Sequence, residues 1–195
     1  MLYVINSYNG NTEWIKDYTD EVVFYDKKDK NVGYNIFDYM DWIVKNYDNL
    51  PDVVLFGKDN MLERHITKEE FDEIKDNKTF TPILTKGHKT DGKINYYKDG
   101  LYYEVNSYWY ANHYGIKDSK SFNELIDLLG VRNKAYLGFP PGGCCIVPKE
   151  NILKHSKEFY IKLLEAVSYK QTPGEAHLIE RCLCYIWGTD TIDGI

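Results

Sequence analysis

The chain lacks the short motifs that identify the best-known nucleotide-binding and hydrolytic sites. It has no GxGxxG and no GxxxxGK[ST] segment, which disfavours a standard dinucleotide-binding fold and a P-loop nucleotide hydrolase. It also has no GxSxG and no HExxH segment, the signatures of α/β-hydrolases and zinc peptidases. Any catalytic role therefore rests on residues outside these common motifs.

Long apolar runs and paired cysteine motifs are also missing. No run approaches the roughly 18 apolar residues that cross a bilayer, and residues 2–5 are too few for the core of a signal peptide. We therefore expect no membrane partner and a cytoplasmic protein. The cysteines occur as Cys144-Cys145 and Cys182-x-Cys184, without the CxxC spacing of a zinc site, so we expect reduced thiols in the core.

The charge balance and the aromatic content bear on the choice of partner. The formal net charge is −6 over 195 residues, and an acidic surface repels phosphate backbones. Lysines recur between Lys86 and Lys98, but Asp91 interrupts this basic stretch. The 18 tyrosines suit stacking on sugars or bases, although an AT-rich genome would produce the same excess.

Apolar periodicity predicts one α/β domain over residues 1–195. Residues 2–6, 22–25 and 53–56 are expected to be strands, and the last is a continuous apolar run typical of a strand covered on both faces. Asn35 is expected to cap the helix between the last two strands. Strands that alternate with helices predict a parallel sheet with right-handed crossovers.

The second half predicts a mixed sheet with an inserted β-hairpin. Asp99-Gly100, the favoured type I′ pair, separates two strand-like runs over residues 93–105. The Pro/Gly-rich loop before residues 144–147 leads into a further strand. The expected N-caps of the later helices are Thr67 and Ser121, each with a glutamate three residues on, and Thr172.

Polar loops follow the three predicted parallel strands and form the first candidate site. They span residues 6–11, 26–35 and 57–60, and ligands bind in open α/β sheets at the carboxyl ends of the strands. Amide and hydroxyl groups there could hold a base and a ribose. Asp59 could hold a divalent cation that bridges a diphosphate, or it could merely cap the next segment.

The last helix and the aromatic middle of the chain are further candidates. His177, Glu180 and Arg181 share one polar stripe, and Glu175 stands near the helix N-terminus. Either glutamate could be a general base or a metal ligand. A cap at Glu175 and a surface ion pair at Glu180 are the structural alternatives. The aromatic residues 108–114 could stack on a sugar ring or a flipped base, or simply cover a small sheet.

Two segments resemble a domain family of unknown function that is itself similar to the GT-A, or nucleotide-diphospho-sugar, glycosyltransferases. The first has the pattern N-x-G, then Y-x-x-x-I-x-x-x-Y-D-x-L-P-D, then an apolar strand, and runs here from Asn31 to Phe56. The second comprises GGCCIVPKENILKHSKEFYIKLLE, which starts at Gly142, and IERCLCYIWG, which ends at Gly188. The resemblance covers residues 1–60 and 136–188 and leaves the aromatic middle unmatched.

The resemblance implies a GT-A-like, Rossmann-type mixed sheet flanked by helices, and a glycosyltransferase that moves a sugar from a nucleotide-diphosphate donor to an acceptor hydroxyl. It implies Mn²⁺ or Mg²⁺ at Asp59, with His177 as a second metal ligand. Because D-x-D is absent, Lys58 is the alternative neutraliser of the phosphates. The implied base is Glu175, or Glu180 if Glu175 only caps the helix. The implied donor-binding residues are Asn6, Tyr8, Asn31, Gly33, Lys58, Asp59 and Asn60, and the acceptor-binding residues are Trp109, Tyr110, Gly142 and Gly143.

Two other functions fit the same residues. The chain could be a non-catalytic module that binds a sugar or a nucleotide on the same fold. It could also be a glycosyltransferase directed at nucleic acid, with a modified DNA base as acceptor. A glycan or a small molecule is equally compatible as the acceptor, so its identity stays open.

Overall fold

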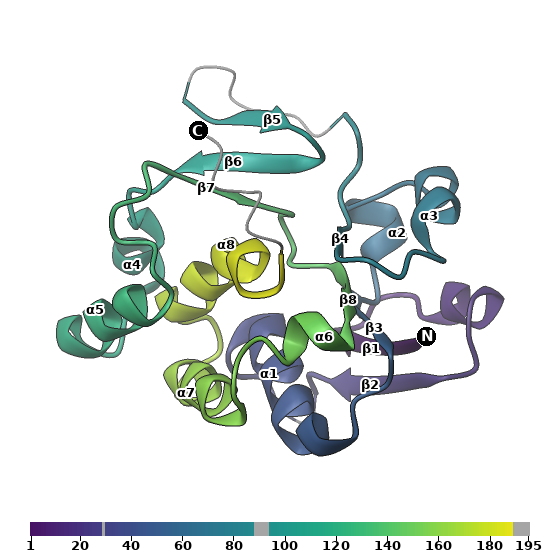
Figure 1. Cartoon of the computed structure of the whole chain (residues 1–195), viewed down its shortest axis with the longest axis horizontal. Helices are drawn as coiled ribbons and strands as arrows, with labels where there is room; N and C mark the ends of the chain where they lie inside the picture. Colours follow the sequence, from purple (N-terminus) through teal and green to yellow (C-terminus); the bar gives the residue numbers. More distant parts are fainter. Residues whose placement is uncertain (29, 88–93, 189–195) are drawn as a thin grey trace.

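The computed structural model describes residues 1–28, 30–87 and 94–188, and it is an α/β arrangement of two sheets and surrounding helices (Figure 1). The larger sheet has the strand order β2-β1-β3-β8-β4, and the smaller sheet has the order β5-β6-β7. Asp91 and the first residue of the expected hairpin, Lys93, lie outside the described residues, as does much of the basic stretch between Lys86 and Lys98.

The larger sheet is mixed, as expected, and its first three strands are parallel. Val4 of β1 is in register with Val23 of β2 and Phe56 of β3. Strand β8 then runs antiparallel to β3, with Val53 opposite Pro148. The strands of this sheet are β1 (Leu2–Ser7), β2 (Val22–Asp26), β3 (Val53–Lys58), β4 (Thr81–Pro82) and β8 (Cys145–Pro148).

Helices cover both faces of this sheet. Neighbouring residues of a strand point to opposite sides, and here the residues on both sides are apolar and buried. Val4 and Val54 belong to one buried cluster with α1, α7 and α8, whereas Ile5 and Leu55 belong to a second cluster with η1, α2 and α3. The connecting elements are η1 (Glu13–Asp17), α1 (Tyr34–Asn46), η2 (Tyr47–Asn49), α2 (Met61–Arg64), α3 (Lys68–Ile74), α6 (Lys149–Ile152), α7 (Lys157–Val167) and α8 (Gly174–Trp187).

Helix α8 lies in the middle of the molecule, between the smaller sheet and the pair α1 and α7 (Figure 1). Trp187 near its end is fully buried and stacks on Phe56 of β3, with ring centroids 5.0 Å apart. All four cysteines are free and buried, in β8, directly before it and in α8, as the sequence predicts. Within the described residues, no helix is both long and apolar enough to span a bilayer.

The smaller sheet contains the predicted hairpin. Asp99 and Gly100 both have positive φ, 52° and 80°, which is the type I′ geometry expected of this pair. Two short helices follow and pack against α8. These elements are β5 (Tyr96–Lys98), β6 (Leu101–Val105), β7 (Tyr136–Phe139), α4 (Trp109–Tyr114) and α5 (Ser119–Leu128).

Helix starts differ from the prediction where the capping side chain has another partner. The capping box of Thr67 and Glu70 is confirmed. Helix α1, however, follows Gly33 in the left-handed conformation, and the Asn35 side chain instead donates to the carbonyl of Gly142 at 3.0 Å. Asp118 rather than Ser121 caps α5, because the Asp118 carboxylate accepts from the Ser121 N–H at 2.8 Å. Helix α8 follows Pro173, so the predicted cap at Thr172 is wrong.

Candidate functional site

A cavity of about 440 Å³ opens at the carboxyl ends of β1 and β3, where the sequence places the first candidate site. We call it the strand-end pocket. Six of the predicted donor-binding residues line it: Asn6, Tyr8, Asn31, Lys58, Asp59 and Asn60. Lys27, Tyr34 and Asn35 also line it and belong to the predicted loop 26–35, although none was named as a donor-binding residue. Arg64, Gln171 and Thr172 line it and lie outside the predicted loops. The pocket therefore combines basic, amide and aromatic groups.

Lys58 ends β3 and brings a buried positive charge to the strand-end pocket. Its side chain is only 8% exposed, yet among the side chains that the structure describes no carboxylate oxygen lies within 4.0 Å of Nζ. Nζ donates to the Tyr34 hydroxyl at 2.9 Å and lies 4.2 Å from the centroid of that ring. A buried ammonium is costly unless an anion pairs with it, so this site is suited to an anionic ligand.

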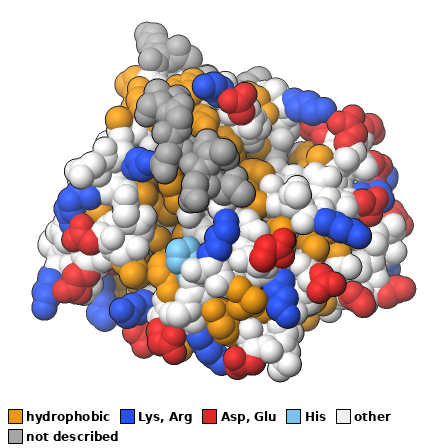
Figure 2. All heavy atoms as spheres, in the orientation of Figure 1, with side chains coloured by type: hydrophobic (Ala, Val, Ile, Leu, Met, Phe, Trp, Pro, Cys, Tyr) orange, Lys and Arg blue, Asp and Glu red, His pale blue; other side chains and the backbone are white. Residues whose placement is uncertain are grey.

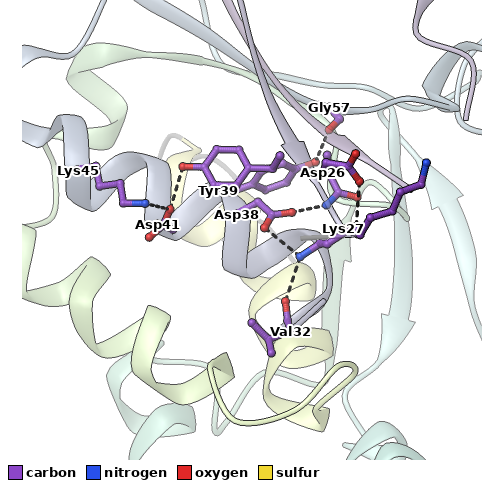
Figure 3. Close-up of polar contacts among 11 residues, drawn as sticks. Asp26, Lys27, Val32, Asp38, Tyr39, Asp41, Lys45 and Gly57 are labelled. Atoms are coloured by element: carbon purple, nitrogen blue, oxygen red, sulfur yellow. Dashed lines mark hydrogen bonds and ion pairs between the residues drawn. The ribbon is translucent and has the colours of Figure 1, made fainter. Parts of the chain in front are cut away.

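The second buried lysine of the pocket has its own counter-ion. Lys27 Nζ lies 2.9 Å from Asp38 Oδ1 and donates to the Val32 carbonyl at 3.0 Å (Figure 3). The Asn6 amide donates to the other oxygen of Asp38. Burial raises the pKa of Asp38 to about 6, although the Lys27 charge acts in the opposite direction. This network fixes the wall of the pocket but leaves little free charge for a ligand.

Asp59 holds the loop after β1 in place. Its Oδ2 accepts from the N–H groups of Tyr8 and Gly10 at 2.6 and 2.7 Å, and from the Ser7 hydroxyl at 3.2 Å. A Cβ at Gly10 would overlap the Asp59 carboxyl group, so the loop needs glycine there. The main-chain carbonyl of Asp59 also accepts from the Trp14 indole at 2.7 Å. Asp59 lies in the pocket as predicted, and its Oδ1 takes part in none of these hydrogen bonds.

The two predicted metal ligands lie in different surroundings. Asp59 lines the pocket, whereas the ring of His177 stacks between Tyr34 and Tyr114, with centroids 5.7 and 4.0 Å away. Among the described residues, no three histidine, cysteine or acidic side chains gather as a metal cluster. Mg²⁺ is often held by one or two carboxylates together with substrate phosphates. Asp59 Oδ1 fits that role, so the divalent cation stays a prediction.

Glu180 is an ionised carboxylate inside the protein. Its Oε1 accepts from the Gly142 N–H at 2.8 Å, and its Oε2 lies 3.6 Å from the Arg181 guanidinium and 3.8 Å from His177 Nδ1. Burial alone would raise the pKa of Glu180. Contact with His177 and the charges of Lys58 and Arg181 outweigh burial and lower the pKa to about 2. A carboxylate with so low a pKa is a weak base at neutral pH.

Glu175 faces away from the strand-end pocket. Its two oxygens accept from the Lys117 N–H and the Tyr169 hydroxyl, each at 2.8 Å. The side chain lines another cavity, of about 510 Å³, beside α5 and α7. Glu175 therefore ties the start of α8 to two neighbouring loops, and Glu180 does not line the strand-end pocket either.

The predicted acceptor residues divide into one exposed and three buried positions. Trp109 is 41% exposed on α4, whereas Tyr110 is 1% exposed. Gly142 and Gly143 are buried in a turn with positive φ, and a Cβ at Gly142 would overlap the His65 ring. Tyr34, His177 and Tyr114 form a continuous ring stack that connects the pocket with α4. Trp109 lies at its far end, 6.1 Å from Tyr114.

The first residues of α1 belong to the predicted loop 26–35, but the predicted donor-binding residues did not include them. Gly33 does not line the pocket but turns the chain with a φ of 64°, which places Tyr34 and Asn35 in it. Asp38 is buried on the same helix. A carboxylate one turn into a helix whose buried face is mostly apolar is the sequence signal that points to Asp38.

Comparisons with known proteins identify no relative of this chain. No protein-family model, no curated protein and no solved structure is significantly similar to the chain. The arrangement of the side chains therefore carries the functional argument.

Proposed function

We propose that the strand-end pocket binds a nucleotide-diphosphate sugar and that the protein transfers the sugar to an acceptor hydroxyl. The observation that carries this proposal is the buried Lys58 ammonium, which has no carboxylate partner among the described side chains. The volume of about 440 Å³ is in the range of small-molecule sites. Amides and a tyrosine ring around one anion-binding group suit a ligand that is part phosphate and part sugar or base.

The same geometry supports separate places for the diphosphate of the donor and for the acceptor. Lys58 would neutralise the diphosphate at the end of β3, with exposed Arg64 as a second cation at the same pocket. A divalent cation on Asp59 would bridge the phosphates. The acceptor would approach over Trp109 on α4, which the stack of Tyr34, His177 and Tyr114 connects to the pocket.

Transfer breaks the bond between the sugar C1 and a phosphate oxygen and forms a bond from C1 to the acceptor oxygen. The electron pair leaves with the diphosphate, and positive charge at Lys58 stabilises that leaving group. Glu180 is a weak base and Glu175 lines another cavity. In our proposal the departing diphosphate therefore takes the acceptor proton, and Glu180 acts by holding the Gly142 turn.

Lys58→Met tests the proposal. Calorimetric titration with UDP, GDP, UDP-glucose and GDP-mannose, each with and without Mn²⁺, should detect binding to the wild-type protein. Lys58→Met should lose at least tenfold in affinity, since a charge-assisted contact contributes about 1.5–3 kcal/mol. The variant also removes a charge that lowers the pKa of Glu180, so its melting temperature is measured to show that the protein is still folded when binding is lost.

Lys120→Met is the matched control, because that side chain is 87% exposed on α5. It should change neither the affinity nor the melting temperature. Equal binding by Lys58→Met and wild type would contradict the proposal. To test the transfer step, chromatography measures the slow release of free sugar from the bound donor.

A non-catalytic binding module is the second candidate, and the positions of the two glutamates favour it. Neither Glu175 nor Glu180 lines the strand-end pocket, so neither predicted base stands beside the ligand. Tight binding of a sugar nucleotide with no detectable release or transfer of sugar would support this candidate. On the face drawn in Figure 2, acidic and basic side chains are interleaved, which gives no support to a nucleic-acid partner.

A further inference from the structure

Two asparagines of the strand-end pocket have carbonyl oxygens that accept no hydrogen bond. Asn35 Oδ1 and Asn60 Oδ1 are both buried, and neither accepts a hydrogen bond of good geometry from a described residue, although the Asn35 amide lies beside the Tyr39 hydroxyl. Leaving such an oxygen unpaired costs about 1–3 kcal/mol. Both residues line the pocket that contains Lys58, but each Oδ1 is itself covered, so the side chain would turn to present its oxygen to a ligand.

Local structure does not explain either oxygen. Asn60 stands at the N-cap of α2, where an asparagine normally accepts from the first turn, but its side chain makes no capping bond. Its amide is therefore free to turn toward a ligand. The Asn35 amide is oriented from its other end, because Nδ2 donates to the Gly142 carbonyl at 3.0 Å and leaves Oδ1 as the remaining acceptor.

We infer that Asn35 and Asn60 accept hydrogen bonds from hydroxyl groups of the ligand whose anionic part Lys58 binds. The pocket would thus select a hydroxyl-bearing phosphate ester over a bare phosphate. This inference rests on the proposed function and adds the residues that distinguish the neutral part of the ligand. A buried polar group left without its partner gives strong discrimination, because the analogue that lacks the donor cannot satisfy it.

The hydroxyls have two possible sources, and the probes separate them. Pyrophosphate carries no hydroxyl donor, UDP carries only those of the ribose, and UDP-glucose adds those of the transferred sugar. Asn60→Ala should bind UDP-glucose roughly fivefold to tenfold more weakly than wild type, the effect of one or two neutral hydrogen bonds. Its affinity for pyrophosphate should be unchanged. A loss with UDP as large as with UDP-glucose assigns Asn60 to the ribose.

Asn60→Ala is a sharp test because the side chain makes no capping bond whose loss would weaken the fold. Its melting temperature should equal or exceed that of wild type, because the change removes a buried oxygen without a partner. Asn123→Ala, exposed on α5, is the control for binding. Asn35→Asp provides a second test of the same prediction, since it keeps the oxygen acceptor. It should still favour UDP-glucose over pyrophosphate.

The inference alone is overturned by equal losses for all three probes in Asn60→Ala. It is also overturned if that variant loses affinity for no probe while Lys58→Met still weakens binding. A melting temperature that falls on Asn60→Ala, with affinities unchanged, would show a structural role and overturn it as well. If wild type binds none of the probes, the proposed function fails, and this inference fails with it.

Discussion

At the scale of single residues, the buried cations differ in whether a carboxylate pairs with them. Lys27 and Arg181 have carboxylate partners in Asp38 and Glu104, and the Lys27 pair fixes a wall of the strand-end pocket. Lys58 has none among the described side chains. An enzyme or binding protein keeps such a group at a cost in stability when its partner is the ligand.

Glu180 gives a pH dependence whose sign follows from its environment. Its pKa in the folded protein is about 2, below the ordinary value of 4.5. Its stabilising contribution is therefore complete above pH 4.5 and is lost as the pH falls toward 2. Glu180→Gln keeps an acceptor for the Gly142 N–H but removes the charge. The variant should be less stable than wild type by on the order of 3 kcal/mol at pH 7.

Urea unfolding of both proteins between pH 7 and pH 2 checks this expectation. The stability difference should shrink steadily below pH 4.5 and approach zero near pH 2. Glu124→Gln, an exposed carboxylate on α5, should show no such pH-dependent difference. A difference that stays constant with pH would mean that Glu180 stabilises the fold by shape and hydrogen bonding rather than by charge.

Gly10→Ala tests the contact between the β1 loop and Asp59. A Cβ there would overlap the Asp59 carboxyl group, which already binds the N–H groups of Tyr8 and Gly10. We expect a loss of about 1–3 kcal/mol, the usual cost of overpacking, and weaker ligand binding because Tyr8 and Asp59 line the pocket. Gly87→Ala is the control, since no atom lies within 4 Å of its added Cβ. Equal melting temperatures for the two variants would contradict this role.

The sequence predicted which residues end the strands, but not what each side chain binds. Asp59 follows a buried strand, and that pattern alone placed it at the correct edge of the sheet. Its bonds to Tyr8 and Gly10 depend on the path of a loop about 50 residues earlier, which no local pattern encodes. Asn35 was predicted as a helix cap for the same reason, because its actual partner Gly142 comes from a distant loop.

At the scale of elements, Glu175 at the start of α8 can be tested for a structural or a catalytic role. Glu175 accepts from the Lys117 N–H and the Tyr169 hydroxyl. Gln can accept only one of these bonds, so Glu175→Gln should cost about 1–2 kcal/mol of stability. It should leave ligand affinity and any sugar transfer unchanged.

Glu165→Gln is the control for that experiment, because Glu165 is exposed at the same cavity. Guanidinium unfolding and donor turnover, measured on all three proteins, give the comparison. A loss of turnover at full stability in Glu175→Gln would restore Glu175 as the base and contradict the structural role.

Element types were easier to predict than element ends. The parallel strands, the type I′ hairpin and the capping box at Thr67 follow from periodicity and turn chemistry, and the structure confirms them. The predicted caps at Asn35 and Thr172 failed, since these side chains face the pocket instead of the helix ends. Side chains kept for a ligand or for a distant loop are those that break local capping rules.

At the scale of the whole molecule, four buried thiols report on global opening. Cys144 and Cys145 lie just before and at the start of β8, and Cys182 and Cys184 lie in α8, so they sample both central elements. Burial raises the pKa of the Cys144 thiol to about 11 and raises those of the other three as well. A thiol-specific reagent at pH 8 should therefore label none in the native state and four after unfolding.

Labelling at increasing urea concentrations, followed by mass spectrometry, provides the measurement. All four sites should react together, with a midpoint equal to that of the loss of tryptophan fluorescence from buried Trp187. Rapid labelling of one pair without denaturant would reveal that β8 or α8 opens independently of the rest.

The antiparallel junction between β3 and β8 has a consequence for how the chain folds. Val53 pairs with Pro148, although residues 59–144 separate these two neighbouring strands along the chain. Pairing at this distance along the chain is slow. Until it occurs, β3 presents an open, strongly apolar edge that other copies can extend into aggregates. Recovery from denaturant should therefore be limited by competition between this closure and association, and favoured by dilution.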